Sequence, residues 1–255
     1  LAARENADLG KFNDARFALE EAGKLSPILG DSQLVRLDEA RLYVNVSEPV
    51  SLAVKAVDSE LYKEASKQIA AADAQIAKAK ERKMDEGVAK RLEDIRTRLL
   101  AAVSKKFVEI MSAAKSHVDR NEFSEAGACI QQAEDLPLDD QTQKDQLQLF
   151  KTDNALKLRQ YVLTLLTDAE AALAKGEFDK ADAALTKVGH MHLTDEEDKT
   201  RLAALQVKFA EEAVKRFNAL FGATEKAIEG SDFPLAQENI VKLRKLPVAK
   251  SLMDK

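Results

Sequence analysis

One local arrangement of residues occurs five times in this chain of 255 residues and constrains its fold more than any other feature. Each copy has an aromatic residue, an alanine three positions later, and a leucine or isoleucine seven positions after the aromatic. The five pairs are Phe12 and Ala15, Tyr62 and Ala65, Phe123 and Ala126, Phe178 and Ala181, and Phe233 and Ala236. Spacings of three and seven residues place side chains on one face of an α-helix. The pattern therefore predicts a short helix in every copy.

Apolar residues also recur upstream of each aromatic residue. Five positions before it stand Ala7, Val57, Val118, Leu173 and Ile228, and twelve positions before it stand Val50, Met111, Leu166 and Phe221. In the last three copies the stripe continues back to Leu92, Leu147 and Leu202. This periodicity predicts a long amphipathic helix of roughly 30 residues, or about 45 Å. Long and short helices are thus expected to alternate along the chain.

Turn-forming residues separate the predicted helices. The segments 8–11, 119–122, 175–177 and 229–232 precede the aromatic residues, and they contain Gly10, Asn121, Gly176 and Gly230. Glycine and asparagine suit the left-handed backbone conformation found at helix C-termini. The segments 25–27, 136–140 and 192–197 precede the long helices, and Thr194 with Glu197 has the spacing of a capping box.

Two segments explain why the intervals between successive aromatic residues are unequal, at 50, 61, 55 and 55 residues. Ser47-Glu48-Pro49 falls inside the first long helix, and we expect that helix to break or kink there because proline lacks a backbone N–H donor. After Tyr62 a stretch rich in Ala, Lys and Glu extends the short helix to Lys83, and a turn follows at residues 85–87.

These elements define an all-α fold. The chain is 45% hydrophobic and 33% charged, as ordered globular proteins are. We expect one continuous domain over residues 1–255, with approximate units 1–30, 31–86, 87–138, 139–193 and 194–255. Each long helix should pair with the preceding short helix along its first half and with the following one along its second. The result would be an elongated, α-solenoid-like array of helical hairpins, and a spectrin-like rod is the alternative. Because Leu1 stands in mid-pattern without an initiator Met, we expect a piece of a longer polypeptide.

The stretch from Gly176 to Val188, Gly-x-Phe-x-x-Ala-x-x-x-Leu-x-x-Val, resembles the second helix of a tetratricopeptide repeat. Pro27, Pro137 and Pro247 fall near the position of that family's helix-ending proline. The family's period is about 34 residues, whereas the last intervals here are 55 residues, and its Trp and Leu-Gly signature is missing. The resemblance implies a tetratricopeptide-like helical repeat with a longer unit. The family's peptide-binding residues are not carried over.

Charge and composition exclude several classes of partner. The formal charge is −5, and basic and acidic residues are interspersed, so we expect no nucleic-acid or anionic-membrane binding. No apolar run reaches the roughly 20 residues that span a bilayer, so we expect no membrane insertion. Cys129 is the single cysteine, which excludes an internal disulfide. It fits a reducing compartment such as the cytoplasm, and a secreted helical protein without disulfides would have the same composition.

The segment His190-Met191-His192, with Asp195, Glu196 and Glu197 after it, is the one cluster in the sequence that could hold a metal. Histidines at positions i and i+2 match neither the i, i+4 pair of zinc hydrolases nor a zinc finger. The carboxylates are explained by helix capping. We therefore expect no metal there.

Other reactive or charged residues also have structural interpretations. Residues 119–123 resemble the start of a calcium loop but place Phe123 at a ligand position. Cys129 occupies a repeat position that holds Ala18, Gln68, Ala184 and Asn239 in the other copies, and His117 lies near a helix end. We expect solvated surface at the basic stretch Lys78, Lys80, Arg82 and Lys83, and at the acidic pairs Asp139-Asp140 and Glu211-Glu212. No catalytic, cofactor-binding or metal-binding residues are predicted, and partner-binding residues stay unassigned.

Three functions are compatible with this sequence. The first is a non-catalytic scaffold that mediates protein–protein interaction, because stacked helical hairpins expose extended surfaces. The second is a structural rod of a cytoskeletal, coat or appendage assembly, which would self-associate. The third is an enzyme with a site between repeat units, although no catalytic motif supports it.

Overall fold

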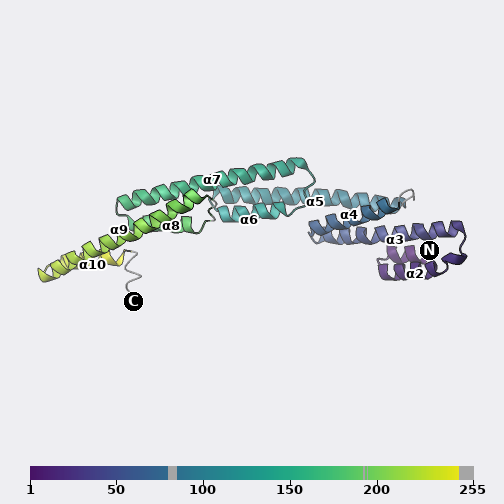
Figure 1. The fold of residues 1–255 in the computed structure, drawn as a ribbon, viewed down its shortest axis with the longest axis horizontal. Helices are drawn as coiled ribbons and strands as arrows, with labels where there is room; N and C mark the ends of the chain where they lie inside the picture. Colours follow the sequence, from purple (N-terminus) through teal and green to yellow (C-terminus); the bar gives the residue numbers. More distant parts are fainter. Residues whose placement is uncertain (80–84, 192, 194, 247–255) are drawn as a thin grey trace. The chain divides into compact units, whose positions relative to one another are not determined.

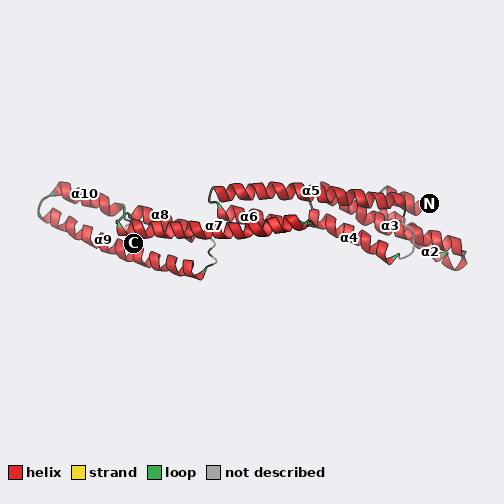
Figure 2. Cartoon of the chain, turned by 90° about the horizontal axis from the view of Figure 1, so that it is seen from above, coloured by secondary structure: helices red, strands yellow, loops and turns green. Residues whose placement is uncertain are grey.

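The computed structural model describes residues 1–79, 85–191, 193 and 195–246. Within these ranges the chain forms ten α-helices and one 3₁₀ helix, joined by turns, and it has no strand (Figures 1 and 2). The helices are α1 (Ala2–Asp8), α2 (Phe12–Lys24), η1 (Ser26–Ile28), α3 (Asp31–Asp58), α4 (Tyr62–Lys78), α5 (Glu86–Asp119), α6 (Phe123–Glu134), α7 (Gln141–Ala174), α8 (Phe178–Gly189), α9 (Glu196–Glu229) and α10 (Phe233–Arg244). The chain is an all-α array of helical hairpins, as the sequence predicts.

Short and long helices alternate as predicted. The short helices α2, α4, α6, α8 and α10 all begin at the aromatic residue of their repeat copy. The long helices α5, α7 and α9 have 34 residues each, and α3 has 28. A helix of 34 residues is about 51 Å long, slightly longer than the apolar stripe alone indicates.

The turn before each short helix has the same geometry in all five copies. The residue two positions before the aromatic has a positive φ in each: Gly10 at +72°, Glu60 at +57°, Asn121 at +59°, Gly176 at +72° and Ser231 at +59°. Its N–H and the following N–H donate to carbonyls of the preceding helix, as in Gly176 N to Leu173 O at 3.0 Å and Glu177 N to Ala172 O at 2.9 Å. This paired bonding is a Schellman motif, which satisfies carbonyls that the helix end would leave unpaired.

One turn departs from the prediction. Gly230 has a φ of −79°, and the neighbouring Ser231 takes the left-handed conformation instead. The position relative to the helix end, and not the residue type, thus determines which residue is left-handed. Serine there carries the steric penalty that a Cβ brings to a positive φ.

Of the two outcomes predicted at Pro49, a break or a kink, the break is wrong. α3 is continuous from Asp31 to Asp58 with Pro49 inside it. Interior proline costs a helix about 3 kcal/mol or more. Here Val46 and Val50 on either side are buried, and α3 packs against both α2 and α4. Burial of this apolar face offsets the lost hydrogen bond, so packing overrides the local preference.

The second short helix is longer than the others, as predicted, but it ends earlier. α4 has 17 residues, whereas α6, α8 and α10 have 12 each. Its last residue is Lys78, and Lys83 lies among residues 80–84, outside the described part of the chain. Two of the three residues of the turn predicted at 85–87 are helical instead, because α5 begins at Glu86. The Asp85 carboxylate accepts a hydrogen bond from Gly87 N at 3.0 Å.

The cap of α9 is Asp195, one residue after the predicted Thr194. The Asp195 carboxylate accepts a hydrogen bond from Glu197 N at 2.9 Å. Thr194 lies outside the described residues. The cap is thus displaced by one position, and Glu196, Glu197 and Asp198 lie in the first turn of the helix, where carboxylates favour the helix dipole.

Internal contacts divide the chain into two compact units. Unit 1 comprises residues 1–114 and 128–149, and unit 2 comprises residues 115–127 and 150–255. The predicted single domain over residues 1–255 stays a prediction. In unit 1, α3 contacts α2 and α4. The most deeply buried side chains of this unit include Val44 and Val46 of α3 and Leu92 and Ile95 of α5. In unit 2, α9 contacts α8 and α10.

Unit 2 shows how the predicted pairing is made. Figure 1 places α8 beside the first part of α9 and α10 beside its last part. Phe178 of α8 meets Phe209 of α9 edge to face, with ring centroids 6.0 Å apart. Ala181 is fully buried in the same core cluster, which allows the helices to approach closely. The expectation that a long helix contacts both the preceding and the following short helix is confirmed for α3 and α9.

Candidate interaction grooves

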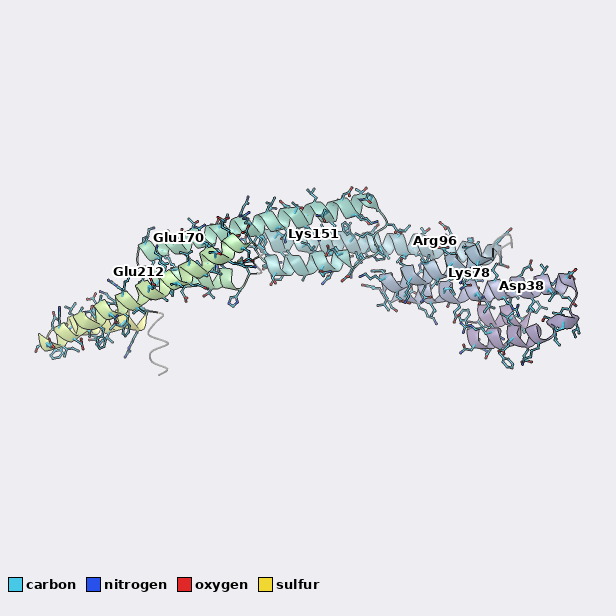
Figure 3. All side chains as sticks on the ribbon, viewed as in Figure 1. Asp38, Lys78, Arg96, Lys151, Glu170 and Glu212 are labelled. Carbon is cyan, nitrogen blue, oxygen red and sulfur yellow. The ribbon has the colours of Figure 1, made fainter. Side chains whose placement is uncertain are left out.

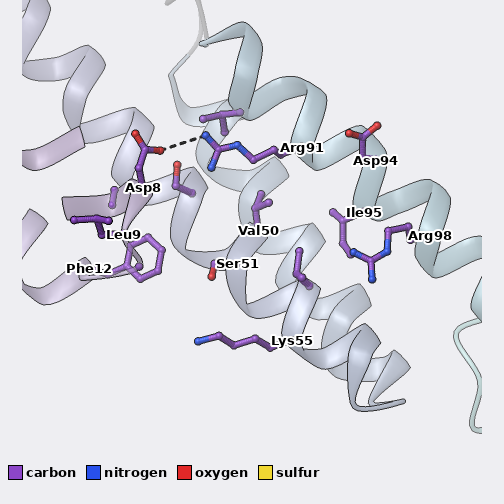
Figure 4. A pocket seen from close by; sticks show the side chains of 15 residues that line it. Asp8, Leu9, Phe12, Val50, Ser51, Lys55, Arg91, Asp94, Ile95 and Arg98 are labelled. Carbon is purple, nitrogen blue, oxygen red and sulfur yellow. Dashed lines mark hydrogen bonds and ion pairs between the residues drawn. The ribbon is translucent and has the colours of Figure 1, made fainter. Parts of the chain in front are cut away.

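Open grooves border the turn and the aromatic residue in three of the repeat copies. The first, the N-terminal groove, lies in unit 1 and has a volume of about 620 Å³. It is formed by the turn between α1 and α2 together with one face of α3 and the first part of α5 (Figure 4). Because three elements separated in sequence meet there, no local motif could have revealed it.

The floor of the N-terminal groove is apolar. Val88 and Ile95 of α5 and Val50 of α3 are buried, and Phe12 covers one side. Among these apolar groups lies Ser47, whose hydroxyl oxygen is buried and has no hydrogen-bond partner within the described part of the chain. A buried hydroxyl without a partner is unusual and costly in a folded protein. The groove therefore offers apolar contact, and the Ser47 hydroxyl oxygen is buried beneath its surface.

One rim of the groove is held by a network around Arg91. The Arg91 guanidinium donates to the Asp8 carboxylate at 3.2 Å and to the Tyr43 hydroxyl oxygen at 3.3 Å, and the Tyr43 hydroxyl donates to Asp8. Arg4 lies over the Tyr43 ring, 5.1 Å from its centroid. The dashed line in Figure 4 marks the Asp8 to Arg91 bond. The network ties the α1–α2 turn to α3 and α5.

The pKa values in this network favour a permanently charged Arg91 and a neutral Tyr43. Burial raises the pKa of Tyr43, and its hydrogen bond to the Asp8 carboxylate raises it further. Burial lowers the pKa of Arg91, but its bonds to Asp8 and Tyr43 outweigh that effect and raise it overall. Both shifts move the titration of these groups further above neutral pH, so Arg91 is charged and Tyr43 is neutral there.

The other rim carries charges that are free to meet a ligand. Arg98 pairs with Asp58 at 2.7 Å, but Lys55 and Asp94 form no ion pair with any described residue. Figure 4 shows Lys55 extending from α3 and Asp94 from α5. An apolar floor between charges of both signs is typical of a surface that binds a protein segment.

Two smaller grooves in unit 2 are equivalent to each other, since nine of the ten residues that line one have a counterpart 55 residues later in the other. The Phe123 groove has a volume of about 400 Å³ and the Phe178 groove about 370 Å³. Each combines the turn, the aromatic residue and the end of the next short helix. Lys187, His190 and Met191 line the first, and Lys242, Lys245 and Leu246, each 55 residues later, line the second. The repeat thus produces a groove, and not only a helix.

The side chains lining these two grooves differ in charge. The Phe123 groove has Glu122 and Glu125 beside Lys187, and Tyr161 packs against Phe123 with ring centroids 5.6 Å apart. In the Phe178 groove Arg216 replaces Tyr161, and the charged lining residues are Lys180, Arg216, Lys242 and Lys245 against Glu177 and Asp179. One groove is therefore acidic and aromatic, and the other is basic.

The candidate metal cluster is divided by the structure. His190 lines the Phe123 groove, while His192 lies outside the described residues. Asp195 and Glu197 instead face Arg159, at 3.0 and 3.6 Å, and the buried Asp198 is 3.8 Å from it. No three His, Cys, Asp or Glu side chains among the residues described come together as metal ligands. Ion pairing and capping account for these carboxylates.

The other candidates occupy structural positions. His117 is in the last turn of α5, where its Nδ1 lies 2.7 Å from the Glu122 carboxylate and not on a terminal carbonyl. Residues 119–123 form a Schellman turn, with Asn121 left-handed and Phe123 buried. Cys129 is half-buried on α6 and unpaired.

The charged stretches also have surface or capping positions. Lys78 ends α4, whereas Lys80, Arg82 and Lys83 are not described. Asp140 accepts a hydrogen bond from Thr142 N at 2.8 Å and so caps α7, and Glu212 pairs with Lys215 at 2.8 Å. Charged side chains of both signs surround the helices, as the labelled Lys78, Arg96, Glu170 and Glu212 illustrate (Figure 3).

Fold and grooves together define the class of this protein: an all-α array of helical hairpins with open grooves at its turns. None of the helices described is both long and apolar enough to cross a membrane. No protein-family model matches the chain, and neither the curated proteins nor the solved structures contain a match.

Proposed function

We propose that this chain is a non-catalytic scaffold that binds partner proteins through the grooves at its turns, with a short helix of the tetratricopeptide-like kind in each unit. The observation that carries the proposal is the equivalence of the Phe123 and Phe178 grooves, whose lining residues recur at a 55-residue interval but differ in charge. A repeat that keeps its scaffold and varies its surface is suited to bind different segments in succession.

The N-terminal groove supports the same function with different chemistry. Its apolar floor of Val50, Val88 and Ile95 could bury an apolar side chain of a partner segment. Lys55 and Asp94 would meet charges of opposite sign on that segment.

A site-specific crosslinking experiment tests this function. A photo-reactive benzoyl-phenylalanine would replace Lys55, which lines the N-terminal groove, or Leu52, which is exposed on the same helix outside it. After irradiation in the native cells, we expect crosslinks to a discrete partner from position 55 and not from position 52. Filling the groove with Ser51→Trp should abolish them. Equal crosslinking from both positions would contradict a groove-specific scaffold.

A structural element of an assembly is the second candidate. It is favoured by the equal length of α5, α7 and α9 at 34 residues and by the identical turn geometry, which together set a regular repeat. Crosslinks from position 55 to a second copy of the chain would favour this alternative. The single cysteine, Cys129, is the basis for placing either role in the cytoplasm.

A further inference from the structure

Three cavities of unit 2 follow one another along a single face of α8. Besides the Phe123 and Phe178 grooves, a third cavity of about 430 Å³ lies at the seam between α7 and α8. This seam cavity shares Lys187 with the Phe123 groove, and it shares Glu177 and Lys180 with the Phe178 groove. The three cavities are therefore continuous, and we call them together the α8 groove.

The walls of the α8 groove come from one stripe on each of two helices. The lining residues are spaced by three and four positions, which puts them on one face of each helix. They include Leu158, Tyr161 and Leu165 of α7, and Lys180, Ala184 and Lys187 of α8. The helices α9 and α10 follow in the chain and leave the seam cavity and the Phe123 groove open. An elongated groove of this kind fits a stretch of polypeptide better than a compact small molecule.

The charge of the α8 groove changes sign along its length. The Phe123 end is bordered by two carboxylates and one lysine, whereas the Phe178 end is bordered by four cations and two carboxylates. Lys180 and Lys242 at the second end pair with glutamates three and four positions before them, at 3.0 and 2.6 Å. The charges without an ion pair to any described residue include Glu125 at the Phe123 end, and Arg216 and Lys245 at the Phe178 end. A ligand with a cation at one end and a carboxylate at the other is complementary to this pattern.

The Phe123 end also has the apolar surface that a long basic side chain needs. The ring centroids of Phe123 and Tyr161 lie 5.6 Å apart, and Leu158 and Met191 complete the apolar wall. Arginine and lysine pack their aliphatic stems along such surfaces, and a cation is attracted to the face of an aromatic ring. An arginine or lysine inserted here would bring its charge to the Glu125 carboxylate, which lines the same groove.

The length of α8 sets the separation between the two ends. α8 has 12 residues, which corresponds to about 18 Å. An extended polypeptide rises about 3.3 Å per residue, so about five or six of its residues span the same distance. The middle of that stretch would lie over the seam, where the small buried side chains of Ala172 and Ala184 let a backbone approach closely.

We propose that the α8 groove binds an extended segment of a partner protein that carries an arginine or lysine, and an aspartate or glutamate about five or six residues away. The basic side chain packs on Tyr161 and pairs with Glu125, and the acidic side chain pairs with Arg216 and Lys245. A nucleic acid is not the occupant, because carboxylates line the groove at both ends and would repel phosphate groups. The inference rests on the proposed scaffold function and names the chemistry of the partner at two of its grooves.

A selection of peptides displayed on phage tests this inference. Random peptides of about twelve residues would be bound to the intact chain, and those that also bind Ala183→Trp would be discarded. Ala183 is exposed and lines the seam cavity, so a tryptophan there fills the groove without entering the core. Asp182→Trp is the matched control, because Asp182 is also exposed and lines none of the three cavities. We expect the retained peptides to share a basic and an acidic residue at the proposed separation, and to bind the control variant as they bind the unchanged chain.

A charge exchange tests which end of the groove binds which charge. Binding of a fluorescently labelled peptide from the selection would be followed by anisotropy. Arg216→Glu and Lys245→Glu together should weaken binding at least tenfold, and a peptide whose acidic residue is changed to lysine should bind this variant again. Such a recovery excludes a folding defect. Lys208→Glu is the matched control, because Lys208 is exposed on α9 and lines none of the three cavities, and it should leave binding unchanged.

Several results would overturn the inference: no peptide that Ala183→Trp excludes, retained peptides without the two charges, equal loss of binding in Asp182→Trp, or failure of the charge exchange to restore binding. Displacement of the peptide by a single-stranded DNA oligonucleotide would assign the groove to nucleic acid and also reject it. These outcomes are separate from those of the crosslinking experiment, which probes the N-terminal groove of unit 1. Retained peptides of another composition would reject this partner class and leave the scaffold function intact.

Discussion

The hairpin that contains α8 and the hairpin that contains α10 have the same sequence pattern and different surroundings. Phe178 and Phe233 begin equivalent helices after equivalent turns. Phe178 is packed between helices, whereas most of Phe233 is exposed. The difference shows that the apolar stripe of a repeat can pack against another helix, and that its side chains are buried only where such a helix lies against them.

The two faces of α10 separate these effects within a single helix. The side chains of α10 that face α9 are as buried as their counterparts in α8, because both short helices pack against α9. The face that would meet a further long helix is open. Substitutions at the second face should therefore differ most in their effect on the free energy of unfolding between the two hairpins. The following variants test that expectation.

The largest difference is expected for alanine substitutions of the aromatic residues. Phe178→Ala should lower the free energy of unfolding by about 3 kcal/mol, because it leaves a cavity in the core of unit 2. Phe233→Ala should change it by less than about 0.5 kcal/mol, as exposed substitutions do. Urea denaturation followed by circular dichroism would measure both, and equal losses would break the comparison.

The next difference concerns the small residue three positions later. Ala181→Leu should destabilise by about 1–3 kcal/mol, because Ala181 is fully buried and a larger side chain overpacks the helix contact. Ala236→Leu should cost less, since α10 can shift toward its open side. Thermal unfolding of the pair would check the order. A larger loss for the second variant would show that α10 is held as firmly as α8.

Substitutions of the left-handed turn residues should change the free energy of unfolding by less, and in opposite directions in the two hairpins. Gly176→Ala should destabilise by about 1 kcal/mol, because a Cβ is unfavourable at a positive φ, and no atom within 4 Å adds a clash. Ser231→Gly should stabilise by up to about 1 kcal/mol for the converse reason. Differential scanning calorimetry would detect both shifts. An unchanged melting temperature for Ser231→Gly would contradict the strain assigned to that turn.

The smallest effect is expected for the ion pair between Arg201 of α9 and Glu170 of α7. Arg201→Ala should cost about 0.5 kcal/mol, since Arg201 and Glu170 are partly exposed and solvent screens the pair. Glu225→Ala, which removes the counterpart of Glu170 55 residues later, should cost nothing measurable. A double-mutant cycle of Arg201 and Glu170, repeated at high salt, would isolate the pair energy. A coupling that does not fall with salt would argue against an ion-pair origin.

Most of the fold could be predicted from the sequence because its signals are local. The starts of the short helices at Phe12, Tyr62 and Phe178, and the left-handed Gly10 and Gly176, depend on residues within one or two turns. Hydrogen bonding and apolar periodicity act over the same short distances.

The candidate sites could be predicted much less well. The contact between Asp8 and Arg91 joins residues 83 positions apart, and that between Tyr43 and Asp8 spans 35 positions. No spacing rule links such residues. The grooves beside Phe123 and Phe178 did have a signal, the conserved 55-residue interval of their lining residues, but it is visible only once the turns and helix ends are placed.

By itself the sequence determined where the short helices begin, which residues form the apolar stripe of each helix and that the chain turns left-handed at Gly10, Asn121 and Gly176, because each depends on neighbours along the chain. Only the tertiary structure decided that α3 continues through Pro49, that the Ser47 hydroxyl is buried without a partner, and that Phe233 is open where Phe178 is closed. Those outcomes depend on which other helices pack against a given face. A stripe of apolar residues shows which face of a helix can pack against another helix. Whether that face is buried depends on the helices that lie against it.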